Sequence, residues 1–155
     1  MSGLLNYTTT IEATKTIAEI QTMLVQAGAK AVIAEFDGAR QPCALSFGIA
    51  TQFGDRAYRL PVNPTAIQAV LVRQFKAGKI QRRFATVEQA LRVSWRINKD
   101  WLAAQLAIIE SGQVSLTRVM LPYMLSASGR TVAELMEDRQ LQLPAGATET
   151  AEESA

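Results

Sequence analysis

The chain has 155 residues, of which 48% are apolar, so it is long enough to bury one hydrophobic core without disulfides or metals. It contains no histidine and a single cysteine, Cys43. It therefore lacks the side chains for Ser-His-Asp or Cys-His catalysis, for histidine-ligated zinc and for an intramolecular disulfide. These absences exclude most ordinary enzymes and predict a non-enzymatic protein of a reducing compartment, without cofactor or metal.

The net charge of +2 is distributed unevenly along the chain. Residues 1–54 carry three basic and four acidic side chains, residues 55–101 carry ten and three, and residues 102–155 carry three and seven. A basic middle with an acidic end predicts an anionic partner, or a tail that folds over the basic part. Because no apolar run is long enough to span a bilayer and no signal peptide is recognisable, we expect a soluble cytoplasmic protein without membrane contact.

The first elements are predicted from β-branching and capping spacing. Residues 6–11 (NYTTTI) are β-branched and alternate, which predicts a first strand. Thr16 and Glu19 have the spacing of a capping box, and apolar residues then recur at helical spacing as far as Gly28. A helix with its apolar side on a sheet should therefore follow the strand.

A three-strand meander is expected next, over residues 30–36, 43–50 and 56–61. Asp37-Gly38 and Gly54-Asp55 are typical of the hairpin turns between these strands. In the middle strand, large side chains alternate with small ones on the opposite face: Ala44, Ser46, Gly48 and Ala50. A face of small residues lets another element approach closely, and we expect a helix there rather than a ligand.

The remaining elements are helices. Asn63-Pro64 predicts an N-cap and first helical residue, with a helix that ends near Gly78. Thr86 with Gln89 predicts the start of a long helix that ends at Gly112 and holds both tryptophans. Ser115 is predicted to cap a short helical turn, and residues 121–125 are predicted to form an extended segment. Thr131 with Glu134 has the spacing of a capping box at the start of a last helix. The fold class is α+β: an antiparallel β-α-β-β-β arrangement followed by helices, with the long amphipathic helix packed on the sheet. Residues 1–143 form one domain and residues 144–155 a disordered acidic tail.

Two groups of cations are candidate ligand contacts. Residues 73–84 hold five cations and no acid, interleaved with Phe75 and Phe84. On the long helix, Arg92, Arg96 and Lys99 form a ridge beside both tryptophans; Glu88/Arg92 and Arg96/Asp100 have the spacing of ion pairs, so a solvated, paired face is the alternative. The predicted ligand-binding residues, with phosphate contacts first and stacking rings last, are Arg82, Arg83, Arg92, Arg96, Lys99, Trp95, Trp101 and Tyr123.

No phosphate-loop, dinucleotide or carboxylate metal motif occurs in the sequence. The segments TIAEIQTMLVQAGAK, ALSFGI, YRLPV, EQALRVSWRINKDWLAAQLAIIESGQV and VMLPYML resemble a family of small proteins encoded by bacteriophages and mobile elements, over about residues 6–139. The resemblance implies a phage accessory context and the cytoplasm of a bacterial host. It transfers neither an activity nor a functional residue.

Our leading hypothesis from the sequence is a non-enzymatic binder of an anionic, nucleotide-like small molecule, in an anti-defence role as a sponge for a host immune messenger. The sequence also allows a homo-oligomer with the pocket at its interface. One alternative is a single-stranded nucleic-acid-binding protein that uses residues 73–84. Another is a protein–protein inhibitor or adaptor with an exposed apolar patch beside the long helix.

Overall fold

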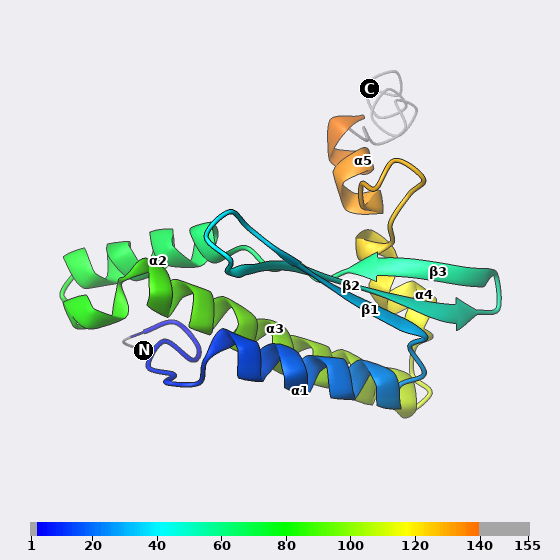
Figure 1. Cartoon of the computed structure of the whole chain (residues 1–155), viewed down its shortest axis with the longest axis horizontal. Coiled ribbons are helices and arrows are strands. Elements are labelled where there is room, and N and C mark those ends of the chain that lie inside the picture. The colour runs from blue at the N-terminus through cyan, green and yellow to red at the C-terminus, as the bar shows by residue number, and fades with distance from the viewer. Residues whose placement is uncertain (1–2, 140–155) are drawn as a thin grey trace, which may run out of the picture.

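The computed structural model describes residues 3–139, which combine helices with a three-stranded antiparallel sheet; α1 and α3 run along one side of this sheet (Figure 1). The α+β class is therefore confirmed. The predicted acidic tail, residues 144–155, lies outside the described residues. In chain order the elements are α1 (Ala13–Gln26), β1 (Ala31–Phe36), β2 (Pro42–Thr51), β3 (Gly54–Arg59), α2 (Pro64–Lys76), the 3₁₀ turn η1 (Arg82–Phe84), α3 (Val87–Glu110), α4 (Leu116–Met120), the 3₁₀ turn η2 (Leu121–Tyr123) and α5 (Val132–Asp138).

The predicted first strand at residues 6–11 is wrong, so the order is α-β-β-β rather than β-α-β-β-β. This segment forms turns instead, and Asn6 adopts a left-handed φ of 64°. The carbonyl oxygens of Tyr7 and Thr9 accept hydrogen bonds from the side-chain amide of Gln89, at 2.8 and 2.9 Å. Because these carbonyls bond to a distant helix, they are not available for a sheet ladder.

The three strands form the predicted meander, in the order β1-β2-β3. The side chain of Asp37 closes the first hairpin by accepting hydrogen bonds from the backbone N–H groups of Ala39 and Gln41, at 2.9 and 3.0 Å. At the β3 edge of the sheet, Met124 forms an isolated antiparallel bridge with Tyr58. The chain after η2 therefore lies beside β3.

The helices pack on the face of β2 that carries large side chains, not on the small-residue face that we expected. Leu45, Phe47 and Ile49 are buried with residues of α1 and α3 in the main core. On the opposite face, Ile33 of β1 is 61% exposed and Ala50 is exposed, and no helix of residues 3–139 covers them. The large alternating side chains of β2 mark the face that the helices cover, because burying them removes the most apolar area from water.

Helix α1 covers one side of this core with Ile17, Ile20 and Leu24. It begins three residues before the predicted capping box: Glu12 is the N-cap residue and makes no side-chain cap bond. Thr16 is buried inside the helix, and the carboxylate of Glu19 reaches α3 instead of a backbone cap. The predicted box at this helix is therefore wrong, because the side chain of Glu19 has a partner elsewhere.

Helix α3 joins the main core to a second, smaller core. Its start is as predicted, with the Thr86 hydroxyl accepting from the N–H of Gln89 at 3.1 Å, and Gly112 follows its end with a φ of 79°. Trp95 and Leu102 of α3 are buried in the main core with α1 and the sheet, whereas Ala90 and Val93 are buried in the smaller core with α2. The smaller core consists of Leu71, Ile80, Ala90 and Val93. The α2–α3 hairpin therefore extends past the sheet (Figure 1).

The C-terminal segment agrees with prediction at its caps and differs in between. The capping box of Thr131 and Glu134 forms with both of its hydrogen bonds and begins α5. Leu121-Pro122-Tyr123 is a 3₁₀ turn rather than part of an extended segment, as the proline at its start favours. Within residues 3–139, no helix has the length and apolar character needed to cross a bilayer.

Candidate anion-binding site

The surface that we call the basic end comprises Arg73, Lys76, Lys79, Arg82 and Arg83. The first two lie in the last turn of α2, the third in the following loop and the last two in η1. Between them, Gly78 reverses the chain with a φ of 73°, and Ile80 is only 8% exposed, in the smaller core. The loop is therefore anchored by an apolar side chain, and the flanking cations point outward.

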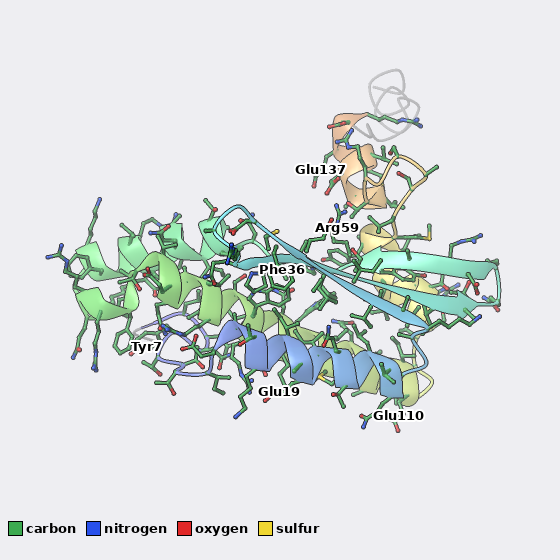
Figure 2. All side chains as sticks on the ribbon, in the orientation of Figure 1. Tyr7, Glu19, Phe36, Arg59, Glu110 and Glu137 are labelled. Carbon is green, nitrogen blue, oxygen red and sulfur yellow. The ribbon has the colours of Figure 1, made fainter. Side chains whose placement is uncertain are left out.

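All five side chains of the basic end are exposed, and none forms an ion pair with another residue of 3–139. Figure 2 shows nitrogen-tipped side chains that project from this end of the molecule, away from the sheet. The nearest acid in sequence is Glu88, in the first turn of α3. The positive end of the α3 dipole adds to the potential here, so the surface attracts anions.

Aromatic rings lie next to these cations. The guanidinium of Arg83 is 4.6 Å from the ring centroid of Phe84, and that ring meets Tyr7 edge to face at 5.3 Å. Phe75, on α2, is 38% exposed. Phe84 is partly buried against the smaller core, so Phe75 is the ring of this pair that a nucleic-acid base could stack on.

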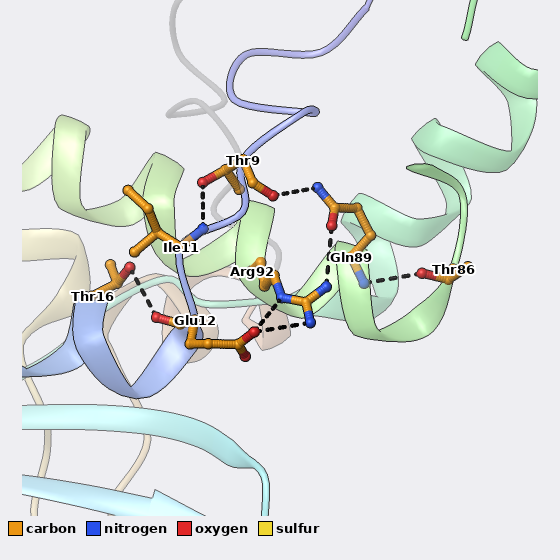
Figure 3. Close-up of polar contacts among 7 residues, drawn as sticks. All are labelled: Thr9, Ile11, Glu12, Thr16, Thr86, Gln89 and Arg92. Atoms are coloured by element: carbon orange, nitrogen blue, oxygen red, sulfur yellow. Dashed lines mark hydrogen bonds and ion pairs between the residues drawn. The ribbon is translucent and has the colours of Figure 1, made fainter. Parts of the chain in front are cut away.

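The predicted cationic ridge on α3 is neutralised by α1. Arg92 donates to Glu12, with Nη2 and Oε1 3.1 Å apart, and also to the side chain of Gln89 (Figure 3). Arg96 lies 2.7 Å from the Glu19 carboxylate, and Lys99 lies 3.6 Å from the same oxygen. The hydrogen bond from Arg96 lowers the pKa of Glu19 below its ordinary value, and the charges of Arg96 and Lys99 add to this effect.

The ridge is thus a paired surface, as the alternative interpretation held, although its partners differ from those expected. The ion pairs predicted within α3, Glu88 with Arg92 and Arg96 with Asp100, do not form in the described part of the chain. Asp100 instead accepts a hydrogen bond from the side chain of Asn6 at 2.8 Å. Three of the eight predicted site residues are therefore occupied by contacts that join α3 to α1.

The predicted aromatic residues lie apart from the basic end. Trp95 is fully buried in the main core, where its Nε1 donates to the Pro42 carbonyl at 3.2 Å, so it cannot stack on a ligand. Trp101 and Tyr123 are half-buried and meet edge to face at 5.2 Å. Trp101 lies 15 residues after Thr86, the N-cap of α3, which is about 22 Å along the helix axis. The predicted set therefore separates into four places: η1, the paired ridge of α3, the main core and the Trp101–Tyr123 pair. Only Arg82 and Arg83 remain at the basic end.

Residues 3–139 contain no group of three or more cysteine, aspartate or glutamate side chains placed to hold a metal ion. Cys43 is exposed and its thiol donates only to the backbone carbonyl of Glu35, at 3.5 Å. The arrangement at the basic end can attract and hold phosphates.

Sequence reasoning did not predict the two buried polar side chains Ser94 and Asn98 in the middle of α3. Both are buried on α3, and both carry a side-chain oxygen without a hydrogen-bond partner in the described residues. The sequence did contain a signal for them: two polar residues four positions apart, one turn of the helix, on the side that is otherwise apolar.

A comparison with protein-family models, with characterised proteins and with solved structures found nothing similar to this chain. The resemblance to phage-encoded proteins accordingly stays a prediction.

Proposed function

We propose that this protein is a non-enzymatic binding protein that holds single-stranded nucleic acid through its phosphates at the basic end. The observation that supports this most is the contrast between the two groups of cations. The five at the basic end are exposed and without ion pairs in residues 3–139, whereas the three on α3 face the carboxylates of Glu12 and Glu19. Unpaired cations gathered on one surface bind phosphates and release the counterions condensed on them.

An extended ligand fits this surface better than a compact one. The charges are spread over the last turn of α2, the loop and η1, and the rings of Phe75 and Phe84 lie among them. A backbone of successive phosphates can contact several of these cations while a base stacks on the exposed ring of Phe75. The pair of Trp101 and Tyr123, about 22 Å along α3, is too distant to stack on the base of a single nucleotide held there.

A free nucleotide shares the phosphate chemistry and would use the same cations, so sequestration of a signalling nucleotide is the second form of this proposal. The two forms differ in the number of phosphates engaged. An oligonucleotide that neutralises five cations should bind with a log–log salt slope of about −3.5, equivalent to about 100-fold weaker binding at 200 mM than at 50 mM salt. A nucleotide with one or two phosphates should depend on salt much less.

The experiment is a fluorescence-anisotropy titration of a labelled dodecathymidylate at several salt concentrations. The double variant R82Q/R83Q should weaken binding at low salt and reduce the slope to about −2, because two fewer phosphates are neutralised. The matched control is R118Q, which removes an exposed arginine on α4, outside the basic end. It should leave both affinity and slope unchanged.

Thermal-shift titrations with cyclic dinucleotides, ADP-ribose and mononucleotides form the second arm. Stabilisation by one of these that resists salt, without oligonucleotide binding, would select sequestration of a free nucleotide. If neither ligand class binds at 50 mM salt, or if R82Q/R83Q binds as the parent does, the proposal fails. A protein partner would then be the remaining hypothesis.

A further inference from the structure

The outer edge of β1 is the edge of the sheet that residues 3–139 leave without a partner. At the opposite edge, Met124 bridges Tyr58 of β3, and the N–H of Leu125 donates to the carbonyl of Ala57 at 2.8 Å. β1 pairs with β2 on its inner side, and no other segment of the described chain bonds to its outer side. A free edge of this kind presents backbone N–H and C=O groups to another strand.

The hydrogen-bond pattern of β2 shows which backbone groups of β1 point outward. The carbonyl of Leu45 accepts from the residue that follows β3, at 3.0 Å, so Leu45 and every second residue after it bond toward β3. The residues between them, such as Ser46, bond toward β1, where Ser46 is paired with Ile33. Ile33 therefore bonds inward, and its neighbours Val32 and Ala34 direct their N–H and C=O groups away from the sheet.

Large apolar side chains are exposed around this edge. Ile33, in the middle of β1, is 61% exposed, and Phe36, at its end, is 59% exposed. Val25 of α1 is 62% exposed and lines, with residues 29–32, a hollow of about 260 Å³ between α1 and β1. The apolar surface therefore continues from the strand to the helix beneath it.

The flank of α1 on this side consists of Ala18, Gln21 and Val25, which recur at helical spacing. Gln21 and Val25 both line the hollow beside β1. The acidic residues of this helix, Glu12 and Glu19, instead pair with cations of α3. The flank is uncharged and its side chains are small or of medium size, so another helix can approach it closely.

A second copy of the chain covers this surface more completely than an isolated strand. A peptide strand would bond to Val32 and Ala34 but would leave the flank of α1 in water. A two-fold axis perpendicular to the sheet brings the same strand and the same helix of each copy together. β1 and α1 are each about 20 Å long and lie about 10 Å apart, so each copy loses roughly 500 Å² of surface. The total of about 1,000 Å² reaches the size at which specific interfaces begin.

We propose that the protein forms a two-fold symmetric dimer in which the β1 strands of two copies pair antiparallel. The two three-stranded sheets then form one continuous sheet. Ile33 lies on the axis, and Val32 of each copy exchanges backbone hydrogen bonds with Ala34 of the other. The dimer is independent of phosphate binding at the basic end.

This register also suits the side chains of β1. Glu35 comes opposite Ala31 of the second copy, so like charges do not face each other across the axis. Phe36 comes opposite position 30 of the second copy, beside the hollow between its α1 and β1. The exposed ring and the exposed Val25 are thereby covered together.

The first test is sedimentation velocity of the full chain, free of nucleic acid, from about 1 to 200 μM. The parent should pass from monomer to dimer with a dissociation constant of about 10 μM, as an interface at the low end of the size range allows. Ile33→Lys should raise this constant at least tenfold, because it places two lysines opposite each other at about 5 Å. Ala57→Lys, on an exposed position of β3 at the opposite edge of the sheet, is the matched control and should dimerise as the parent does.

The second test measures the register by disulfide cross-linking with diamide. Cys43→Ser first removes the native cysteine, which is exposed. Ile33→Cys in this background should then form a cross-linked dimer on a non-reducing gel, because the two thiols meet at the axis. Ala31→Cys is the matched control, on the same face of β1: its two copies would lie about 13 Å apart along the strands, which is too far for a disulfide.

Three results would overturn the assignment. One is a parent protein that stays monomeric at 200 μM, which would leave the edge of β1 to a strand of another protein. Another is a folded Ile33→Lys variant that dimerises as the parent does, because the contact would then lie elsewhere. The third is a cysteine at position 33 that cross-links no faster than one at position 31, and this comparison decides the matter if Ile33→Lys does not fold.

Discussion

Replacing Trp95 with phenylalanine tests whether this indole is part of the core or of a binding surface. Trp95 is fully buried, and its Nε1 donates to the carbonyl of Pro42, the first residue of β2. This hydrogen bond connects the middle of α3 to the start of a strand 53 positions earlier. The substitution keeps a ring in the core but removes the donor and part of the buried area.

The expected loss has two parts. The smaller ring buries roughly 40 Å² less surface, worth about 1 kcal/mol. The Pro42 carbonyl loses its partner in a dry environment, which costs about 1–3 kcal/mol. The free energy of unfolding should therefore fall by about 2–4 kcal/mol, and the melting temperature by roughly 5–15 °C for a chain of this size.

Urea denaturation followed by far-UV circular dichroism measures this change, with the slope of the transition as a check that the unfolded state is unaltered. Trp101→Phe is the matched control: that ring is half-buried and its Nε1 donates no hydrogen bond to residues 3–139. It should cost about 1 kcal/mol or less. A Trp95→Phe protein with the stability of the parent would refute the assignment of Trp95 to the core, and stacking by this indole would again be open.

Three other substitutions probe contacts of α3 and α5. Glu19→Gln should lower the free energy of unfolding by about 1 kcal/mol at neutral pH, because Arg96 and Lys99 lose their countercharge. Because the pKa of Glu19 is lowered in the folded protein, this contribution is fully present above the ordinary glutamate pKa of about 4.3 and is lost as the pH falls through the folded value. The stabilities of the parent and of Glu19→Gln should therefore become equal in acid. Gln89→Ala should cost about 1–2 kcal/mol and speed amide exchange in residues 4–11, whose carbonyls it frees; unchanged exchange would contradict the anchoring role. Thr131→Ala should cost about 1 kcal/mol and expose α5 to faster exchange without affecting α3, since only the α5 cap is removed.

The parts of the fold that depend on neighbouring residues were predictable from the sequence. The start and end of α3 follow from Thr86 and Gly112, and the N-caps Asn63 and Ser115 each make the expected bond to a backbone N–H. The first hairpin follows from Asp37 in the same way. All of these signals act over four residues or fewer, which is the range that a sequence pattern can describe.

The errors concern contacts between residues that are distant in sequence. Residues 6–11 have the pattern of a strand, but Gln89, 80 or more positions later, binds their carbonyls. The charges of Arg92 and Arg96 were visible, whereas their partners on α1 are 80 and 77 positions away. The exposure of the cations at the basic end was predictable, because no carboxylate of the described chain pairs with them and their surroundings are solvent.

The two-core arrangement of α3 has a consequence for how the chain folds. The smaller core joins residues between Leu71 and Val93, a stretch of 23 positions, so it closes over short loops at a small cost in chain entropy. The main core needs α1 and the sheet to meet α3 across separations such as the 77 positions between Glu19 and Arg96. Contacts of short separation form sooner than distant ones. The basic end is therefore expected to assemble first, before α1 contacts α3 and its carboxylates pair with Arg92, Arg96 and Lys99.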